Sequence, residues 1–540
     1  MNSVSFPQAF RIFRVTTLTG LLLHGLFTLA GCGGGSSGSG PPPPPVAQFS
    51  ASPTEGVFPL TVTFDGTSSD SPGSTLVAWS WDFGDGNTGS GSTVTHDYAE
   101  VGEYTVSLTV RNARGTEHQV TFANLIDVHR TIWRYDVDKP IYYSAPAVGA
   151  DGTIYFSTGI LIHTSMGRVH AVYPDGTTRW MVDLNDDSPP PDGVPRAVNN
   201  GASPAIGHDG TIFVVDHRNV VYAFDSAYGE RRWTNDSFES DTPWPVGQKT
   251  PAIGADGTLY VCAGHNGENT LYALNPVDGQ EIWRYEGLRI GNVCATSAVV
   301  GAGGVVYVAS NDWFYAFNSD GTLHWPEPFA LAQVSEKTFS SPTIDGDGVI
   351  YFGAESAVPN PHGVVYAVNP DGTLRWRYVV PGERFVRASP AIGPDGRIYV
   401  TTRAYVNSEG AAQPAWCIAF EPDGSVAWIF EIPTISETIP ADSYTSPAIG
   451  ADGVVYFAAE TGYIYALNSD GSLRWQERFG NTINWSSPAI MPDGTLYIGG
   501  NRGNDWGGRL VAVQTESFGY ALSPWPKFRR DHANSGATAP

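Results

Sequence analysis

The sequence predicts an all-β protein in which a small antiparallel sandwich precedes an eight-bladed β-propeller. Short runs of β-branched and aromatic residues alternate with clusters of Gly, Pro, Asn and Asp along most of the chain. The composition includes 62 glycines in 540 residues, which suits a protein with many tight turns. A repeat begins eight times in the second part of the chain, at a spacing of 41 to 58 residues. A period near 40–50 residues with four short strands per unit is typical of a propeller blade.

Residues 1–31 are predicted to be a lipoprotein signal peptide. A basic segment precedes the apolar run Val15 to Ala30, which is too short and too poorly flanked for a stable transmembrane helix. The run ends in Leu-Ala-Gly-Cys32, which resembles the lipobox of bacterial lipoproteins. The resemblance implies acylation of Cys32 and a membrane anchor of several acyl chains. The alternative is an ordinary secretory signal with a chance cysteine.

The residue after Cys32 is Gly33, not the Asp that retains lipoproteins of this class in the inner membrane. The resemblance therefore implies an outer-membrane lipoprotein that faces the periplasm or the cell surface. Residues 32–45 continue as a Gly/Ser tether and a stiff run of five prolines. The formal net charge of the chain is −24, and such a surface repels phosphate, so we exclude nucleic acid as a partner.

Residues 46–129 are predicted to form the sandwich, because apolar and polar residues alternate in runs such as Tyr104 to Val110. The motifs Trp-Asp-Phe-Gly-Asp-Gly at 81–86 and His-Asp-Tyr at 96–98 closely resemble those of the polycystic-kidney-disease (PKD) domain. The resemblance implies an immunoglobulin-like fold that acts as a spacer or adhesion module. Asp82 and Asp85 could ligate a metal, but we favour a role in turn formation.

Residues 130–515 are predicted to form the propeller. The repeat has the core S-P-A-I-G-x-D-G-x-[IV]-Y-[VF], followed by Y-A-[VLF]-[ND]-x-D-G-x-x-x-W. Each unit gives four strands, A to D, with Asp-Gly turns after strands A and C and a Trp at the end of strand D. Repeats one to seven place this Trp at positions 180, 233, 283, 325, 376, 428 and 475. One flat ring per blade suits packing between neighbouring blades better than an aromatic ligand cage.

This repeat resembles the pyrroloquinoline-quinone (PQQ) type of propeller repeat. The segment Ala223-Phe224-Asp225, then Gly229 and Trp233, comes closest to the docking motif of that family, although Tyr228 replaces the expected Thr. The resemblance covers nearly all of 130–515 and implies the fold, but that fold serves both quinoprotein dehydrogenases and non-enzymatic envelope proteins. Those dehydrogenases have a calcium site and usually two adjacent cysteines, and here no two cysteines are adjacent.

We therefore expect a non-enzymatic cell-envelope lipoprotein that binds or scaffolds a protein or glycan partner, without a cofactor or metal. The first alternative is a periplasmic or surface quinoprotein dehydrogenase that uses PQQ with calcium. The second is an accessory protein of glycan degradation, because PKD domains often accompany enzymes that act on polysaccharides. The sequence leaves open the partner, the oligomeric state and whether Cys262 and Cys294 form a disulfide or remain thiols.

Candidate binding residues are placed on the longest connections between strands, since loops on a rigid scaffold carry most binding functions. The connections at about 181–202, 403–415 and 356–363 are long, and 501–509 is rich in Arg, Asn and Trp. We select seven binding candidates from these connections: Arg403, Tyr405, Asn501, Arg502, Asp505, Trp506 and Arg509.

The eighth repeat lacks a strand D, and a segment from the other end of the domain is expected to supply it. Thr131-Ile132-Trp133-Arg134-Tyr135 resembles the strand D segments of other repeats and would bring the number of blade tryptophans to eight. Closing the ring in this way would remove an open blade edge. Residues 516–540 are predicted to form a C-terminal tail, with Trp525 to Arg530 beside the same seam.

Overall fold

The computed structural model describes residues 42–141, 144–159, 167–184, 202–238, 250–265, 268–288, 296–332, 335–356, 361–404, 412–434, 442–479, 486–502 and 507–538. These residues are almost entirely β-structure, as predicted, with one short 3₁₀ turn at Ala302–Gly304. Among them, no helix is long and apolar enough to cross a membrane. Cys32 and the rest of the signal segment lie outside the described residues.

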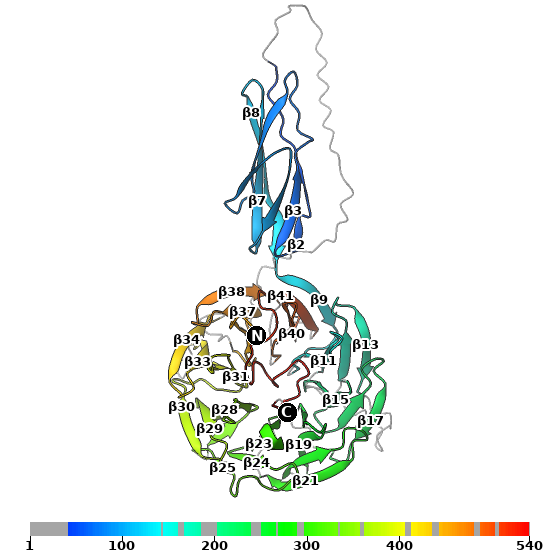
Figure 1. Cartoon of the computed structure of the whole chain (residues 1–540), viewed down its shortest axis with the longest axis vertical. Helices are drawn as coiled ribbons and strands as arrows, with labels where there is room; N and C mark the ends of the chain where they lie inside the picture. Colours follow the sequence, from blue (N-terminus) through cyan, green and yellow to red (C-terminus); the bar gives the residue numbers. More distant parts are fainter. Residues whose placement is uncertain are drawn as a thin grey trace, which may run out of the picture. The chain divides into compact units, whose positions relative to one another are not determined.

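The N-terminal domain is a two-sheet sandwich (Figure 1). One sheet has the order β1-β3-β6 and the other β2-β8-β7-β4-β5. The strands are β1 (Ser50–Ser52), β2 (Glu55–Val57), β3 (Leu60–Asp65), β4 (Leu76–Asp82), β5 (Thr88–Ser90), β6 (Thr93–Tyr98), β7 (Gly102–Asn112) and β8 (Glu117–His129). Phe64, Trp81 and Leu108 are buried in its core, as alternation along the strands requires.

The second domain contains eight successive sheets among the described residues, arranged in a ring (Figure 1). The first four blades comprise β10 (Ala147–Val148), β11 (Ile154–Thr158), β12 (Arg168–Val172), β13 (Thr178–Asp183); β14 (Ala205–Ile206), β15 (Ile212–Val215), β16 (Val221–Phe224), β17 (Arg231–Asn235); β18 (Ala252–Ile253), β19 (Leu259–His265), β20 (Glu268–Leu274), β21 (Glu281–Leu288); and β22 (Val299–Val300), β23 (Val306–Ser310), β24 (Trp313–Phe317), β25 (Phe329–Ala330).

Blades five to eight follow the same antiparallel order from the inner strand A outwards. They comprise β27 (Thr343–Ile344), β28 (Ile350–Ser356), β29 (His362–Val368), β30 (Leu374–Val379), with the extra strand β26 (Glu336–Thr338) on β28; β31 (Ala391–Ile392), β32 (Ile398–Thr401), β33 (Ala415–Phe420), β34 (Val426–Ile432); β35 (Ala448–Ile449), β36 (Val455–Ala458), β37 (Tyr463–Leu467), β38 (Leu473–Arg478); and β39 (Ala489–Ile490), β40 (Thr495–Asn501), β41 (Gly508–Gln514), β9 (Thr131–Val137).

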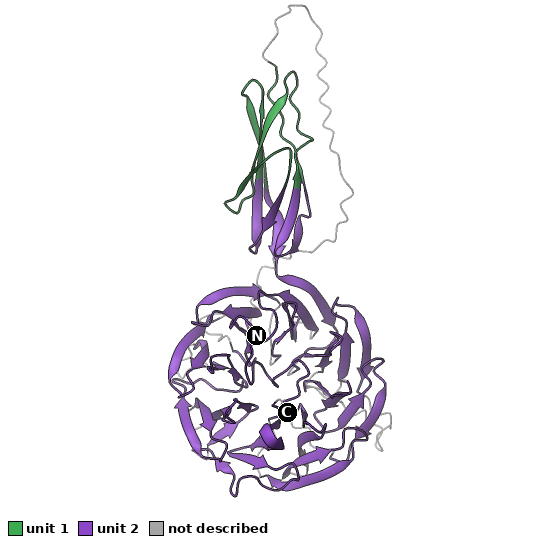
Figure 2. Ribbon diagram, in the orientation of Figure 1, with its two compact units in different colours: residues 1–50, 64–94, 107–122 green, residues 51–63, 95–106, 123–540 purple. Residues whose placement is uncertain are grey.

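By its contacts the chain divides into two compact units, shown in different colours in Figure 2. One unit comprises residues 1–50, 64–94 and 107–122, and the other comprises 51–63, 95–106 and 123–540. The propeller lies entirely within the second unit.

The blade tryptophans join each blade to the next one. In every blade except the seventh, the indole Nε1 donates to a backbone oxygen in the C–D turn of the next blade. Examples are Trp180 to Ser226 at 2.9 Å and Trp233 to Pro276 at 3.0 Å. The indole ring also covers the turn glycine, so a Cβ on Gly279 would lie 2.5 Å from Trp233. The packing interpretation of these tryptophans is therefore confirmed.

Strand D does not end at the Trp, as the repeat suggested. The Trp is the third residue of strand D in seven blades, and the strand continues for two to five residues because its alternating residues still pair with strand C. Blade four differs, since Pro326 and Pro328 follow Trp325 and cannot donate to the ladder. Its strand D is reduced to β25.

Replacing Gly279 with Ala should lower the free energy of unfolding by about 2–5 kcal/mol, because the new Cβ meets both a positive φ of 73° and the Trp233 ring. Gly453→Ala is the matched control, since Gly453 has a φ of 79° but open space where the Cβ would be. Urea denaturation of both variants measures the difference. Equal losses would show that the Trp–Gly contact between blades adds nothing.

The ring closes as the sequence predicts. β9 pairs with β41 in an antiparallel register that places Trp133 opposite Ala512 and Asp136 opposite Arg509. Trp133 then donates to the Pro174 oxygen of blade one at 2.8 Å. Blade eight has no Asp-Gly turn after its strand C to receive Trp475, and the side chain of Glu516 accepts its Nε1 proton at 3.1 Å instead.

The predicted position of the tail beside this seam is wrong for Trp525 to Arg530. The described part of the tail runs through the middle of the ring, where the backbone oxygens of Trp525 and Pro526 accept from the N–H groups of Ile392 and Ile449, each at 2.7 Å (Figure 1). The physical reason is that the innermost strand of each blade has a free edge, whose N–H groups need acceptors once they are buried.

Candidate functional site

The two faces of the propeller differ in how regular they are. Strand order places the A–B and C–D turns on one face, here called the turn face, and the B–C and D–A connections on the other, called the loop face. On the turn face each Asp-Gly turn is built in much the same way. Asp371, for example, accepts from Thr373 N at 3.0 Å and from its hydroxyl at 2.6 Å.

Charged side chains that do not recur from blade to blade lie together on the loop face of blades five to seven. We call this set the loop-face cluster; it comprises Glu355, Arg387, Arg403, Asp442, Tyr444 and Glu460. The residues of the cluster lie at or just after the ends of strands B and in the segments just before strands A. Because every blade is pinned by its own sheet and by its Trp contact, these side chains are held by a rigid scaffold.

Two arginine–carboxylate pairs organise the cluster. Arg387 binds Glu355 through two nitrogens, at 2.8 and 2.6 Å, and its guanidinium lies 4.7 Å from the Phe339 ring centre. The Nε of Arg403 lies 3.2 Å from Asp442. Bidentate arginine pairs have a defined geometry, so these groups present a fixed pattern of charge.

Asp442 is the centre of the second pair. Besides Arg403 it accepts from Ala404 N at 2.8 Å and from the Tyr444 hydroxyl at 3.2 Å. Burial raises the pKa of Asp442 and outweighs the opposing effect of Arg403. The arginine charge and the hydrogen bonds therefore offset only part of the free energy that the Asp442 carboxylate loses when it is removed from water.

Glu460 is the carboxyl group of the cluster whose pKa is raised close to neutral pH. Burial, the largest cause, and the nearby Asp442 charge together raise the pKa of Glu460 to about 7, against the opposing effect of Arg403. A carboxyl group with this pKa exchanges its proton near neutral pH and ionises readily when a cation or a hydrogen-bond donor approaches. The cluster is thus suited to binding a polar or charged ligand.

This shift predicts a pH dependence of stability. Between pH 4.5 and about 7 the folded chain holds the Glu460 proton more tightly than the unfolded chain, so the contribution of Glu460 to stability should fall as the pH rises through this range. Glu460→Gln should remove that fall. Urea denaturation at pH 5 and pH 8 should show that the variant gains stability relative to wild type at pH 8; an equal difference at both pH values would contradict it.

Of the four predicted binding residues that the structure describes, Arg403 alone belongs to this cluster. Arg509 instead binds Asp136 of β9 at 2.5 and 2.9 Å, and Arg502 lies 3.6 Å from the same carboxylate. These two arginines therefore hold the closing strand. Asn501 is buried at the end of β40. Tyr405, Asp505 and Trp506 lie outside the described residues.

The sequence analysis missed Glu355, Arg387, Asp442, Tyr444 and Glu460. A signal was present in part: Arg387 stands two residues before the Ser of S-P-A-I, at a position where no other repeat has a charged residue. The pairing of Arg387 with Glu355 could not be read from the chain, since it depends on the distance between two adjacent blades.

A cavity lies on the turn face. A cavity of about 520 Å³ is bounded by the A–B turns of blades one to three and by the tail, with Asp151, His208 and Asp531 in its lining. The carboxylates there are already used within the chain, because Asp151 pairs with Arg179 and Asp531 accepts from Ser535. We therefore prefer the loop-face cluster as the candidate site.

Acidic side chains are not clustered for calcium binding in the part of the chain that the structure describes. Calcium prefers six to eight oxygen ligands, and the described part of the chain contains no group of three or more His, Cys, Asp or Glu side chains placed to share an ion. Asp345 accepts two backbone N–H groups of its own turn. In the sandwich Asp82 accepts the N–H group of Gly84 and Asp85 that of Asn87, in agreement with their predicted role in turn formation.

Two cysteines can be assigned. Cys262 is disulfide-bonded to a partner outside the described residues. Cys417 is a free thiol, and complete burial raises its pKa, so it is a packing residue and not a nucleophile.

Family comparisons agree with this architecture. A PKD domain model matches residues 42–126. The propeller-repeat family described as "Outer membrane protein assembly factor BamB" matches residues 165–357, 239–413 and 361–517, which together span more than half of the chain. The chain belongs to this family. Both resemblances drawn from the motifs, to PKD domains and to PQQ-type repeats, are thereby confirmed.

Curated relatives of this BamB-family chain match only short parts of it. A microbial collagenase of Vibrio alginolyticus is 38% identical over 65 residues, which is 12% of this chain and 8% of the collagenase. The pre-pro-metalloprotease PrtV of Vibrio cholerae is 42% identical over 120 residues, or 17% of this chain and 13% of the protease. The chain thus spans less than a sixth of the length of these relatives.

Solved structures show the propeller fold. A europium-containing methanol dehydrogenase is 12% identical, with a TM-score of 0.51 over 72% of this chain and 93% of that one. The Dos1 propeller is 9% identical, with a TM-score of 0.52 over 73% and 97%. BamB from Moraxella catarrhalis has 14% identity and a TM-score of 0.48, with 72% and 100% covered. Because an enzyme has this fold, the fold alone does not separate catalysis from binding.

Proposed function

We propose that this BamB-family chain is a lipid-anchored protein of the outer membrane that binds a protein or glycan partner through the loop face of its propeller. The observation that carries the proposal is the loop-face cluster, where paired arginines and a largely buried carboxyl group, Glu460, stand on an otherwise repetitive scaffold. The family description, an outer membrane assembly factor, supports an envelope location. The PKD domain is proposed to act as a spacer or adhesion module.

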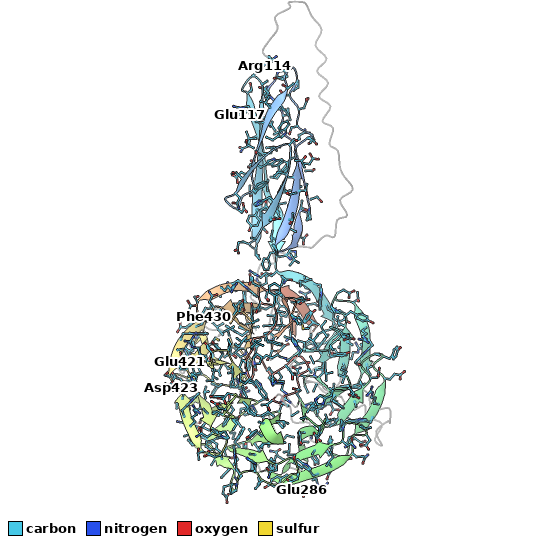
Figure 3. The ribbon with its side chains drawn as sticks, in the orientation of Figure 1. Arg114, Glu117, Glu286, Glu421, Asp423 and Phe430 are labelled. Carbon is cyan, nitrogen blue, oxygen red and sulfur yellow. The ribbon has the colours of Figure 1, made fainter. Side chains whose placement is uncertain are left out.

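The arrangement of the acidic side chains favours a binding role over the dehydrogenase alternative. The acidic turn residues, such as Asp371 and Asp423, are exposed at the ends of blades, and each is used by its own turn. Figure 3 shows the acidic residues Glu286, Glu421 and Asp423 at the outer edge of the ring. A solvated acidic rim of this kind keeps an exported protein soluble.

Adding PQQ and Ca²⁺ to the purified chain separates the two functions. We expect no stoichiometric uptake by absorbance after gel filtration, because the described residues provide no shared calcium site. Uptake of one quinone per chain, together with dye reduction in the presence of an alcohol, would replace the binding proposal with the dehydrogenase. A glycan array on the same preparation distinguishes a glycan partner from a protein partner.

The anchoring part of the proposal predicts that Cys32→Ser releases the chain from membranes, since the acyl chains supply the membrane affinity. Wild type should sediment with membranes after a high-salt wash, and the variant should remain in the supernatant. Immunoblots of the two fractions provide the measurement. A variant that still sediments after the wash would show that the lipobox interpretation is wrong.

A further inference from the structure

The inner strands of the blades provide a ring of backbone donors at the hub of the propeller. The second residue of strand A donates its N–H to a backbone oxygen of the tail in six blades. These donors are Val148, Ile206, Ile253, Val300, Ile392 and Ile449, and their acceptors are the oxygens of His532, Ala533, Ser535, Gly536, Trp525 and Pro526, at 2.7 to 2.9 Å. In blade eight, Ile490 N donates to the Tyr520 hydroxyl at 3.0 Å. The tail thus pairs with the free edges of seven blades.

Side chains of the tail bind the carbonyl groups of the same strands. Arg529 donates to the oxygens of Ala298 and Pro251, the latter at 2.8 Å. Asn534 donates to the oxygens of Ala145 and Pro204, at 3.3 and 3.1 Å. One tail residue therefore connects blades three and four, and another connects blades one and two.

The tail is buried to a degree that is unusual for a terminal segment. Trp525, Phe528, Arg529 and Asn534 are each at most 1% exposed, and Trp525 packs in a core cluster with residues of blades four to six. Burying an arginine requires that its donors find acceptors. Two strand carbonyls accept from the Nη atoms of Arg529, whereas its Nε is buried without a partner among the described residues.

The backbone conformation of the tail is also specific. Arg529, Arg530 and Asn534 have positive φ values of 58°, 73° and 54°. Residues other than glycine persist in this region only where the surroundings determine the conformation. A Cβ on Gly536 would lie 2.0 Å from the Arg529 guanidinium, so the loop is closed tightly around that group.

From these observations we infer that the hub of the propeller is a peptide-binding site, and that its ligand is the chain's own segment 523–538. The site recognises an extended peptide by main-chain pairing with successive blades. It selects sequence through a buried Trp, a buried Phe, an Arg that caps two carbonyls and an Asn that caps two more. Occupied in this way, the hub joins the blades a second time, independently of the β9 closure at the rim.

The test uses the full chain with a protease recognition sequence inserted between Leu522 and Ser523, since Leu522 is 98% exposed. After folding and cleavage, the fragment that begins at Ser523 should remain bound through size-exclusion chromatography. A fluorescent synthetic peptide of residues 523–538 should exchange into the site slowly and saturably. A scrambled peptide of the same composition should not exchange.

Two arginine variants give a matched comparison. Arg529→Ala should speed release of the fragment by at least about 100-fold, because two buried charge-assisted hydrogen bonds are lost. Arg530→Ala should change release little, since the partners described for the Arg530 guanidinium, Pro524 and Asp531, belong to the tail itself. Immediate loss of the wild-type fragment, or equal retention of the Arg529→Ala fragment, would overturn the inference.

Hydrogen exchange on the uncut chain keeps the inference testable if the insertion prevents folding. The amides of Ile253 and Val300 should exchange faster in the Arg529→Ala chain and at the wild-type rate in the Arg530→Ala chain. Unchanged protection of both amides in Arg529→Ala would show that the tail is not held by this site.

Discussion

A chain without residues 131–137 is expected to unfold at a markedly lower urea concentration, with a loss of about 3–5 kcal/mol of unfolding free energy. The deletion exposes the edge of β41. It also removes the Trp133 contact with blade one and the Asp136 carboxylate that forms an ion pair with Arg509. A closed ring depends on this strand because strand D of the last blade has no other source in the structure.

Single substitutions separate the ring closure from the general effect of a deletion. Trp133→Ala should cost about 2–4 kcal/mol, because the indole covers Gly176 of blade one. Ile132→Ala should cost little, since Ile132 is exposed on the same strand. A deletion chain whose urea midpoint equals that of wild type would show that β9 does not close the ring.

Arg218→Ala is expected to cost about 3–5 kcal/mol, because it leaves Asp216 as a buried charge without its partner. Asp216 has no exposed side-chain surface and Arg218 is only 6% exposed, and Nε and Nη2 both lie 3.1 Å from the carboxylate. The pair fixes the B–C turn of blade two, whose backbone N–H groups also donate to Asp216.

A matched control lies in the same blade. Arg232 pairs with Asp209 and Asp225, but its side chain is 39% exposed, so Arg232→Ala should cost about 0–1 kcal/mol. Urea denaturation of the two variants at one pH gives the comparison. Equal losses would mean that burial does not set the energy of these ion pairs.

The repeat made the propeller predictable from the sequence, because each blade presents the same strand pattern, Asp-Gly turns and Trp. Even the non-local closure could be predicted, since Trp-Arg-Tyr at 133–135 repeats the strand D segments at 283–285 and 376–378. The long-range pairing could be predicted from a local pattern because a Trp at this place in the pattern marks a strand as strand D of a blade.

The tail and the loop-face cluster were not predictable in the same way. The tail binds mainly through its backbone and through residues with positive φ such as Arg529, and neither feature has a periodic pattern. To predict the cluster, one must know that Arg403 of blade six lies next to Asp442, which precedes blade seven. Distances between blades depend on the curvature of the ring, and a single sequence does not encode that in any local motif.

The most direct measurement of the proposed function is site-specific photo-cross-linking in cells. One chain carries the cross-linking amino acid at Glu460 on the loop face, and a control chain carries it at Asp470 on the turn face of the same blade. The account predicts a discrete cross-linked envelope partner from position 460 and none from position 470. Cross-links of equal yield from both positions, or from position 470 alone, would contradict a binding function of the loop face.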